Sequence, residues 1–176
     1  MRARPADRGF TLVELLIVVA IIGVLAVLAL PSMRDLLLTN RMKTVSLDLY
    51  TSLTLARSEA IKRNAGNVSL VPVSGSWQNG WQVCVDSNSD GSCSGEILLM
   101  QGDPVDPSVT LATSPVVTLF AYGRDGRLTS TTAGFRITVT GNPDSFTVPM
   151  RCVELNASGR PSTRADNNHT ASDGCN

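Results

Sequence analysis

The run from Phe10 to Leu30 constrains this chain more than any other feature of its sequence. It comprises 21 residues, and Glu14 is the only charged one. About 20 apolar residues in a helix cross the roughly 30 Å hydrocarbon core of a bilayer, so the run is long enough to span it. An ionised side chain inside a membrane costs about 2.5–3.5 kcal/mol on insertion scales. Glu14 therefore needs a partner if the run lies in lipid.

The charges before the run predict its orientation. Arg2, Arg4 and Arg8 precede it, and the positive-inside tendency then leaves the N-terminus in the cytoplasm. A secretory signal would have a shorter apolar region that ends at a small-residue cleavage site, whereas this run continues into Pro31. The sequence thus predicts a membrane-anchored protein with an exported domain.

Residues 67–176 have the length of one small domain. They contain six arginines and ten acidic residues, so this part of the chain is net acidic by four charges. A generally basic domain that binds nucleic acid is therefore not indicated.

Four cysteines lie beyond the apolar run, and their even number indicates disulfides in an oxidising compartment. Three pairings are possible, and the most economical one closes two local loops, Cys84–Cys93 and Cys152–Cys175. Zinc is the competing interpretation, but the chain has no CxxC motif and a single histidine, His169.

The sequence after Pro31 predicts that the helix continues. Pro31 should bend the helix without ending it, because it removes one backbone hydrogen bond in an interior turn. Gly66 is a candidate left-handed C-terminal cap. We expect one helix over residues 10–63, about 80 Å long at about 1.5 Å per residue. Apolar residues at spacings of three or four give its second half one stripe, formed by Leu38, Met42, Val45, Leu49, Leu53, Ala56 and Ala60.

From Asn67 onward the pattern changes to short strands and turns. Apolar or alternating runs are separated by clusters of Gly, Pro, Asn, Asp and Ser, which predicts one antiparallel sheet covered by the helical stripe and an α+β fold class. The last stretch, residues 156–174, is polar and is expected to be a loop. The predicted strands cover residues 67–73, 81–86, 96–101, 116–122, 135–140 and 145–155.

The segment "RGFTLVELLIVVAIIGVLAVLALP", from Arg8 to Pro31, resembles the N-terminal signal of type IV pilins and type II secretion pseudopilins. The resemblance implies that a prepilin peptidase cuts between Gly9 and Phe10 and that the new amine of Phe10 is methylated. It also implies that Glu14 pairs with the N-terminal amine of a neighbouring subunit, and that Pro31 kinks the helix. Pairing makes two charges tolerable that are each costly in an apolar medium.

The same resemblance implies the type IV pilin fold and a division of the chain. Residues 1–9 are then the leader peptide, 10–30 the transmembrane and filament-core helix, 31–66 an amphipathic helix, and 67–176 a β-rich head with a C-terminal disulfide loop. The protein is expected in the inner membrane with one span, its N-terminus in the cytoplasm and its head in the periplasm, until it joins a pilus or pseudopilus.

Two further segments, "TSLTLARSEAIKRN" (51–64) and "WQNGWQVCVDSNSDGSCSGEILL" (77–99), are similar to the GspH/FimT group of pilin-like proteins. This similarity implies a minor type IV pilin that primes or takes part in pilus assembly. Its partners would be the prepilin peptidase, other major and minor pilins, and the inner-membrane assembly platform. The alternative is a minor pseudopilin of a type II secretion system.

The segment "DSNSDG", Asp86–Gly91, has the beginning of an EF-hand calcium loop. Its twelfth position is Ile97, however, with Glu96 one residue early. A hairpin turn rich in Asp and Asn, closed by a disulfide, explains the same residues. The chain also lacks a phosphate loop and a nucleophile–base pair, so we predict no metal, no cofactor and no enzymatic activity.

The segment "SGRPSTR" places Arg160 and Arg164 in the expected C-terminal loop. It partly resembles the Gly-Arg-x-Arg element through which DNA-binding FimT-like pilins hold DNA. Here the second arginine comes four residues after the first, and Pro161 intervenes. A few arginines would give weak, salt-sensitive binding. A glycine-led turn with solvated arginines is the competing interpretation, and a DNA receptor at the pilus tip is the third candidate function.

Overall fold

The computed structural model describes residues 10–64, 67–166, 168, 170, 171 and 175. The chain divides into two compact units, Met1–Leu36 and Leu37–Asn176, and we call the second unit the head. Helix α1, Leu12–Arg63, contributes residues to both. The predicted helix is thus confirmed except for its first two residues. Gly66, its expected cap, lies outside the described residues.

Helix α1 continues past Pro31, as predicted. Within the described part of the chain, no single helix is long and apolar enough to span a membrane alone. The segments Leu12–Val27 and Ser32–Arg63 satisfy both criteria together as a bent pair. The bend falls at residues 28–31, where a proline removes a backbone donor.

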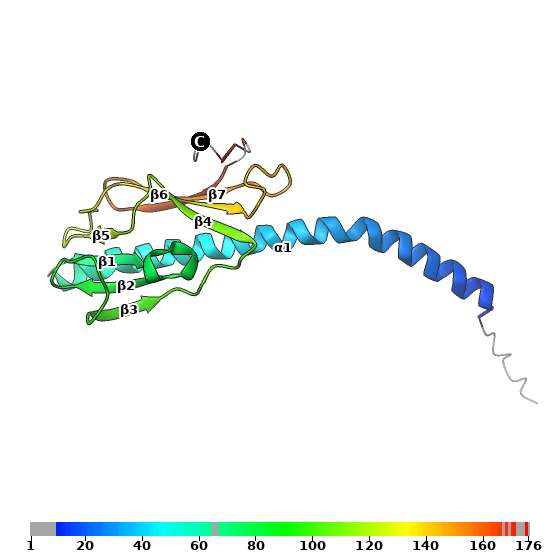
Figure 1. Cartoon of the computed structure of the whole chain (residues 1–176), viewed down its shortest axis with the longest axis horizontal. Helices are drawn as coiled ribbons and strands as arrows, with labels where there is room; N and C mark the ends of the chain where they lie inside the picture. Colours follow the sequence, from blue (N-terminus) through cyan, green and yellow to red (C-terminus); the bar gives the residue numbers. More distant parts are fainter. Residues whose placement is uncertain (1–9, 65–66, 167, 169, 172–174, 176) are drawn as a thin grey trace, which may run out of the picture. The chain divides into compact units, whose positions relative to one another are not determined.

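The head contains two four-stranded antiparallel sheets, so the prediction of a single sheet is wrong (Figure 1). The first sheet has the strand order β3-β2-β1-β5, and the second has the order β4-β6-β7-β8. Two short 3-10 turns, Val73–Gly75 and Trp77–Asn79, lie between β1 and β2. The strands are β1 Asn67–Pro72, β2 Trp81–Asp86, β3 Ile97–Gln101, β4 Val109–Ser114, β5 Phe120–Tyr122, β6 Gly134–Val139, β7 Arg151–Leu155 and β8 Pro161–Ala165.

Two strands, β4 and β8, were absent from the sequence prediction. Strand β4 does alternate, with Val109 and Leu111 buried and Thr110 exposed, but this short run lies between two prolines. Strand β8 carries no buried side chain, and the prediction of a loop there is wrong. It is a strand only because its backbone pairs with β7, from Arg151↔Ala165 to Leu155↔Pro161. Hydrophobic periodicity cannot detect such an edge strand.

The core of the head joins α1 to both sheets. The predicted stripe is confirmed: its five fully buried members belong to the core cluster, and Leu38 and Val45 pack against it. Three rings from different elements meet at centroid distances of 4.8 to 5.7 Å: Trp77, Phe120 and Phe135. The buried members of the stripe are Met42, Leu49, Leu53, Ala56 and Ala60.

Trp81 connects the first sheet to the helix. Its indole Nε1–H donates to Ser52 Oγ at 2.8 Å, and its carbonyl accepts the N–H of Gly102 at 2.8 Å. The ring itself lies against Gly102, where an added Cβ would come within 2.8 Å of ring atoms Nε1 and Cδ2. The chain after β3 therefore passes so close to the indole that only glycine fits.

Gly102→Ala should destabilise the head, because the new methyl group overlaps a buried ring that cannot move freely. Overpacking of this kind typically lowers the free energy of unfolding by about 1–3 kcal/mol. Urea unfolding followed by tryptophan fluorescence measures the change. Gly23→Ala is the matched control, because its Cβ meets nothing within 4 Å and it lies outside the head. Equal unfolding midpoints for the two variants would contradict the close packing.

Candidate functional site

The N-terminal processing segment is described from Phe10 onward, and Gly9 lies outside the described residues. Phe10 is 90% exposed. Next to it, Thr11 and Glu14 bond reciprocally: the N–H and Oγ1–H of Thr11 donate to Glu14 Oε2 at 2.9 and 3.1 Å, and the N–H of Glu14 donates to Thr11 Oγ1 at 3.2 Å. This arrangement is a capping box at the start of α1.

The capping box gives Glu14 a partner that the sequence prediction missed. Its signal, Thr-x-x-Glu before an apolar run, is present in the sequence as Thr11 and Glu14. Both hydrogen bonds end on Oε2, and among the described residues none reaches Oε1. The carboxylate is therefore partly satisfied within one chain, and one oxygen remains for a second donor.

Among the described residues of its own unit, the apolar run has no protein partner that covers it. Its large side chains whose placement is described, from Leu12 to Val27 together with Leu30, are roughly half to three-quarters exposed. Side chains of this kind need lipid or other apolar helices around them. The segment is therefore suited to storage in a membrane and to packing in a helical bundle.

The cysteines form two local disulfides. Cys84 of β2 bonds Cys93 in the following loop, and Cys152 of β7 bonds Cys175 near the C-terminus. The first closes the segment that resembles a calcium loop. The second ties the C-terminal segment to the second sheet, where Arg136 Nη1 also donates to the carbonyl of Ala171 at 2.7 Å.

In the calcium-like loop, protein donors occupy the first carboxylate. Asp86 is buried, and its oxygens accept hydrogen bonds from Ser69 Oγ and from the N–H groups of Asp90 and Gly91 at 3.0 to 3.1 Å. This is the Asp-anchored hairpin turn that competes with the calcium interpretation. In the described part of the chain, no group of three His, Cys, Asp or Glu side chains is arranged to hold a metal ion. His169 lies outside the described residues.

Arg160 and Arg164 have different surroundings. Arg164 Nη2 contacts Glu154 Oε1 at 2.7 Å on the neighbouring strand. Arg160 is exposed after a turn in which the N–H of Gly159 donates to the carbonyl of Asn156. Its side chain lines a groove with Arg57 of α1. The structure thus contains the glycine-led turn, and within the described part of the chain no common partner joins the two arginines.

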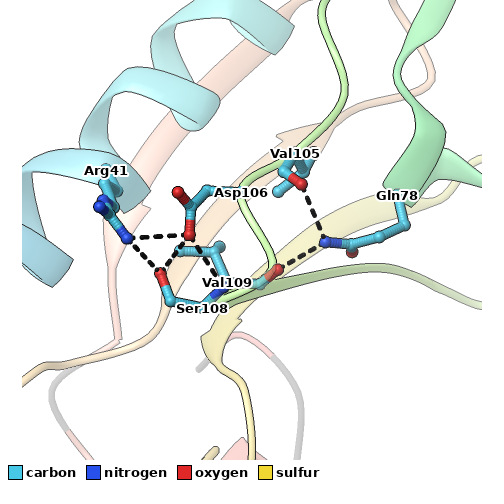
Figure 2. Close-up of polar contacts among 6 residues, drawn as sticks. All are labelled: Arg41, Gln78, Val105, Asp106, Ser108 and Val109. Carbon is cyan, nitrogen blue, oxygen red and sulfur yellow. Dashed lines mark hydrogen bonds and ion pairs between the residues drawn. The ribbon is translucent and has the colours of Figure 1, made fainter.

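A polar cluster fixes the loop before β4 to α1 (Figure 2). Arg41 Nη1 contacts Asp106 Oδ1 and donates to Ser108 Oγ, both at 2.9 Å. The same Asp106 oxygen accepts the N–H and Oγ–H of Ser108 at 2.9 and 2.6 Å. Gln78 Nε2 holds the other side of the loop, donating to the carbonyls of Val109 at 2.7 Å and Val105 at 3.5 Å.

Two family models match the chain. The model for "Type II transport protein GspH" matches residues 46–159, and the "Prokaryotic N-terminal methylation motif" matches residues 4–30. The first covers the end of α1 and most of the head, and the second covers the apolar run with Arg4 and Arg8 before it.

Solved structures share the fold. A crystal structure of the type IV minor pilin FimU from Pseudomonas aeruginosa strain PAO1 superposes with a TM-score of 0.58 at 22% identity, covering 71% of this chain and 89% of FimU. A second crystal form of FimU gives a TM-score of 0.56 at 22% identity, covering 69% and 91%. The predicted fold, a long N-terminal helix packed on antiparallel β-structure, is confirmed.

Curated relatives are also pilins. The pilin-like protein PilA1 of Thermus thermophilus is 44% identical over 85 residues, which are 47% of this chain and 51% of PilA1. The type IV major alpha-pilin of Moraxella bovis is 47% identical over 49 residues, 28% of this chain and 31% of that pilin. The chain thus spans about half or less of these relatives. They and the fold neighbours are structural proteins rather than enzymes.

Asp106→Asn should remove part of the acid sensitivity of the head. The hydrogen bonds from Ser108, followed by the charge of Arg41, lower the pKa of the Asp106 carboxyl below its ordinary value. A lowered carboxyl pKa stabilises the fold above the unfolded-state pKa, and this contribution is lost as pH falls through the folded-state pKa.

Thermal melts between about pH 2 and about pH 7 test this expectation. Below about pH 4 the melting temperature of the wild type should fall more steeply than that of Asp106→Asn. Asp35→Asn lies outside the head and should follow the wild type. Parallel curves for all three proteins would show that the Asp106 cluster contributes nothing to acid stability.

Proposed function

The chain belongs to the GspH family of type IV pilin-like proteins, and from this premise we infer that it is a minor type IV pilin that takes part in pilus assembly. One observation supports the proposal above all: the same chain contains the N-terminal methylation motif and a head with the fold of a solved minor pilin. The first supplies a stored, processable helix, and the second supplies a surface that other subunits recognise.

In this proposal the chain waits in the inner membrane as a single-pass protein with its N-terminus in the cytoplasm and its head in the periplasm. A prepilin peptidase cleaves between Gly9 and Phe10, and Phe10 is then N-methylated. The assembly platform moves the processed subunit into the filament. The exposed apolar side chains of residues 12–30 support this path, because they gain protein partners only when several helices pack together.

Glu14 pairs with the amine of a neighbouring subunit during assembly. Among the described residues no donor reaches Oε1, which supports this role, since Thr11 bonds only to the other oxygen. The capping box lowers the cost of keeping the carboxylate in lipid before assembly, and the intersubunit amine then supplies the opposite charge. The bend at Pro31 separates this segment from the part of α1 that belongs to the head.

A minor pseudopilin of a type II secretion system is the second candidate, favoured by the description of the matching family as a type II transport protein. DNA binding through Arg160 and Arg164 is less well supported, because Arg164 already pairs with Glu154.

Deletion of the gene separates the two leading candidates. If the protein is a minor pilin, the deletion strain should lose some or all of its surface pili, counted by electron microscopy, and should still secrete enzymes normally. Normal pili together with blocked secretion would show instead that the protein is a minor pseudopilin of the secretion system. Normal pili and secretion with failed transformation would favour the DNA receptor.

Glu14→Ala should leave cleavage intact and reduce incorporation into filaments. Loss of one partner of a buried ion pair costs about 3–5 kcal/mol, so incorporation should fall by about a hundredfold or more. Immunoblots of sheared filaments and membranes measure both steps. Thr11→Ala is the control, because it breaks the same capping box but keeps the carboxylate. If both variants lose incorporation equally, the cap rather than the intersubunit pair is responsible.

A further inference from the structure

Phe146 is a large apolar side chain that the head leaves 84% exposed. It lies in the loop between β6 and β7, residues 140–150. The loop holds it outward: Ser145 and Val148 on either side are buried, and the N–H of Val148 donates to Ser145 Oγ at 3.2 Å. Phe146 cannot turn inward without displacing these buried neighbours. A single exposed apolar residue needs no partner in general, so its place in the head decides what it can contact.

The β6–β7 loop lies at the end of the head where α1 enters it. The last residue of β6 pairs with the first residue of β4. Directly after β6, the N–H of Thr140 donates to the carbonyl of Ser108 at 3.0 Å, and Ser108 accepts a hydrogen bond from Arg41 of α1. Figure 1 shows the connection from β6 to β7 beside the start of β4. We call this the entry end of the head, defined by Arg41, Ser108 and residues 140–150.

Chain connectivity keeps the entry end close to the membrane surface. In the proposed function residues 10–30 span the bilayer, and the head begins at Leu37. Residues 31–36 are the only link between them, and they are helical, so they extend about 9 Å at about 1.5 Å per residue. The headgroup layer reaches about 5–7 Å beyond the hydrocarbon core on each side. The loop is therefore within reach of lipid headgroups while the subunit is stored.

A head tethered in this way needs only a small apolar contact to stay on the membrane. The anchor makes contact with lipid an intramolecular event, with an effective concentration that reaches the order of mM for short links. Apolar side chains of interfacial segments enter the boundary between headgroups and acyl chains to a depth of about 5–10 Å. Leu37, which is half exposed, lies at the same end and adds apolar surface to that of Phe146.

The charges at the entry end decide the kind of lipid. Asp106 is paired with Arg41, and Asp144 Oδ1 accepts the N–H of Ala171 at 2.6 Å. Asp103 lies beside Leu37 and Arg41 in the lining of one groove. Three carboxylates against one arginine do not attract anionic lipids. The contact is therefore apolar in origin and suits zwitterionic headgroups.

We propose that Phe146 inserts into the headgroup layer of the inner membrane and holds the entry end of the head against zwitterionic lipid while the subunit is stored. This inference rests on the storage step of the proposed function. It gives the stored subunit a second contact with the membrane, besides the spanning helix, which must break when the subunit enters the filament.

Tryptophan reporters test the contact with the full chain in bilayers. Phe146→Trp, Val116→Trp and Val19→Trp are each reconstituted into phosphatidylcholine nanodiscs whose acyl chains carry bromine either near the headgroup or near the bilayer centre. Bromine quenches an indole that it contacts. The wild type gives the background emission, because Trp77 and Trp81 are buried in the head.

Val116→Trp is the matched control. Val116 is 90% exposed, but it follows the opposite end of β4, about 17 Å along the strand from the entry end. Val19→Trp reports whether the anchor itself lies in the bilayer.

We expect bromine near the headgroup to quench most of the added emission of Phe146→Trp and to leave that of Val116→Trp unchanged. Iodide in the water should quench Val116→Trp and not Phe146→Trp. Equal quenching of these two variants by the brominated lipid, or none in Phe146→Trp, would overturn the contact. Stronger quenching after addition of phosphatidylglycerol would overturn the assignment to zwitterionic lipid.

A protein partner for Phe146 would give a different result. Phe146→Trp would then remain unquenched in bilayers and would be shielded from iodide only in sheared filaments. That outcome would assign Phe146 to a neighbouring subunit and would contradict the lipid contact.

The failure of this contact and the failure of the proposed function are distinguishable. If bromine near the bilayer centre quenches Val19→Trp but Phe146→Trp is never quenched, storage in the membrane holds and the contact is wrong. If Val19→Trp is not quenched, the storage step fails and the contact fails with it. If pili do not require the gene while Phe146→Trp is quenched, the contact is real and the pilus assignment is wrong.

Discussion

Burial of one helical stripe organises the whole head. The residues from Met42 to Ala60 bring α1 into a core shared with both sheets, and the two sheets have no common strand. Because the stripe is continuous, the helix cannot leave the head without exposing it to water. The boundary of the compact head therefore falls inside α1, at Leu37, and not at the end of the helix where the sequence pattern changes.

The first part of the same helix is apolar and contains one carboxylate. Its described apolar side chains are exposed within their own unit, and its one carboxylate would be costly in lipid. The capping box between Thr11 and Glu14 satisfies backbone donors and gives the carboxylate local hydrogen bonds. A neighbour's amine can then add the missing charge, so one residue serves both the isolated subunit and the assembled filament.

Close backbone contacts decide which polar groups meet on the head. Gly126 and Gly159 lack the side chains that would keep their segments apart, so the turn after β5 lies against the segment before β8 and against Arg57. Arg160 consequently lines a groove with Arg57, which is distant in sequence, whereas Arg164 pairs with Glu154 across the β7–β8 ladder. Proximity in sequence is a poor guide to shared function here, because Arg160 lies in the turn before β8 and Arg164 lies within the strand, so the two side chains have different neighbours.

The sequence by itself determined the long helix, its buried stripe, the β-rich head and the pilin family, because periodicity and the N-terminal motif are local. The capping box was equally local and could have been read from Thr11 and Glu14. Only the tertiary structure decided that the strands form two sheets and that the polar segment of Pro161–Ala165 is a strand. It alone placed the turn after β5 against Arg57 and Gly159, because these contacts join segments more than thirty residues apart. Such contacts follow from chain packing and leave no periodic signal in the sequence.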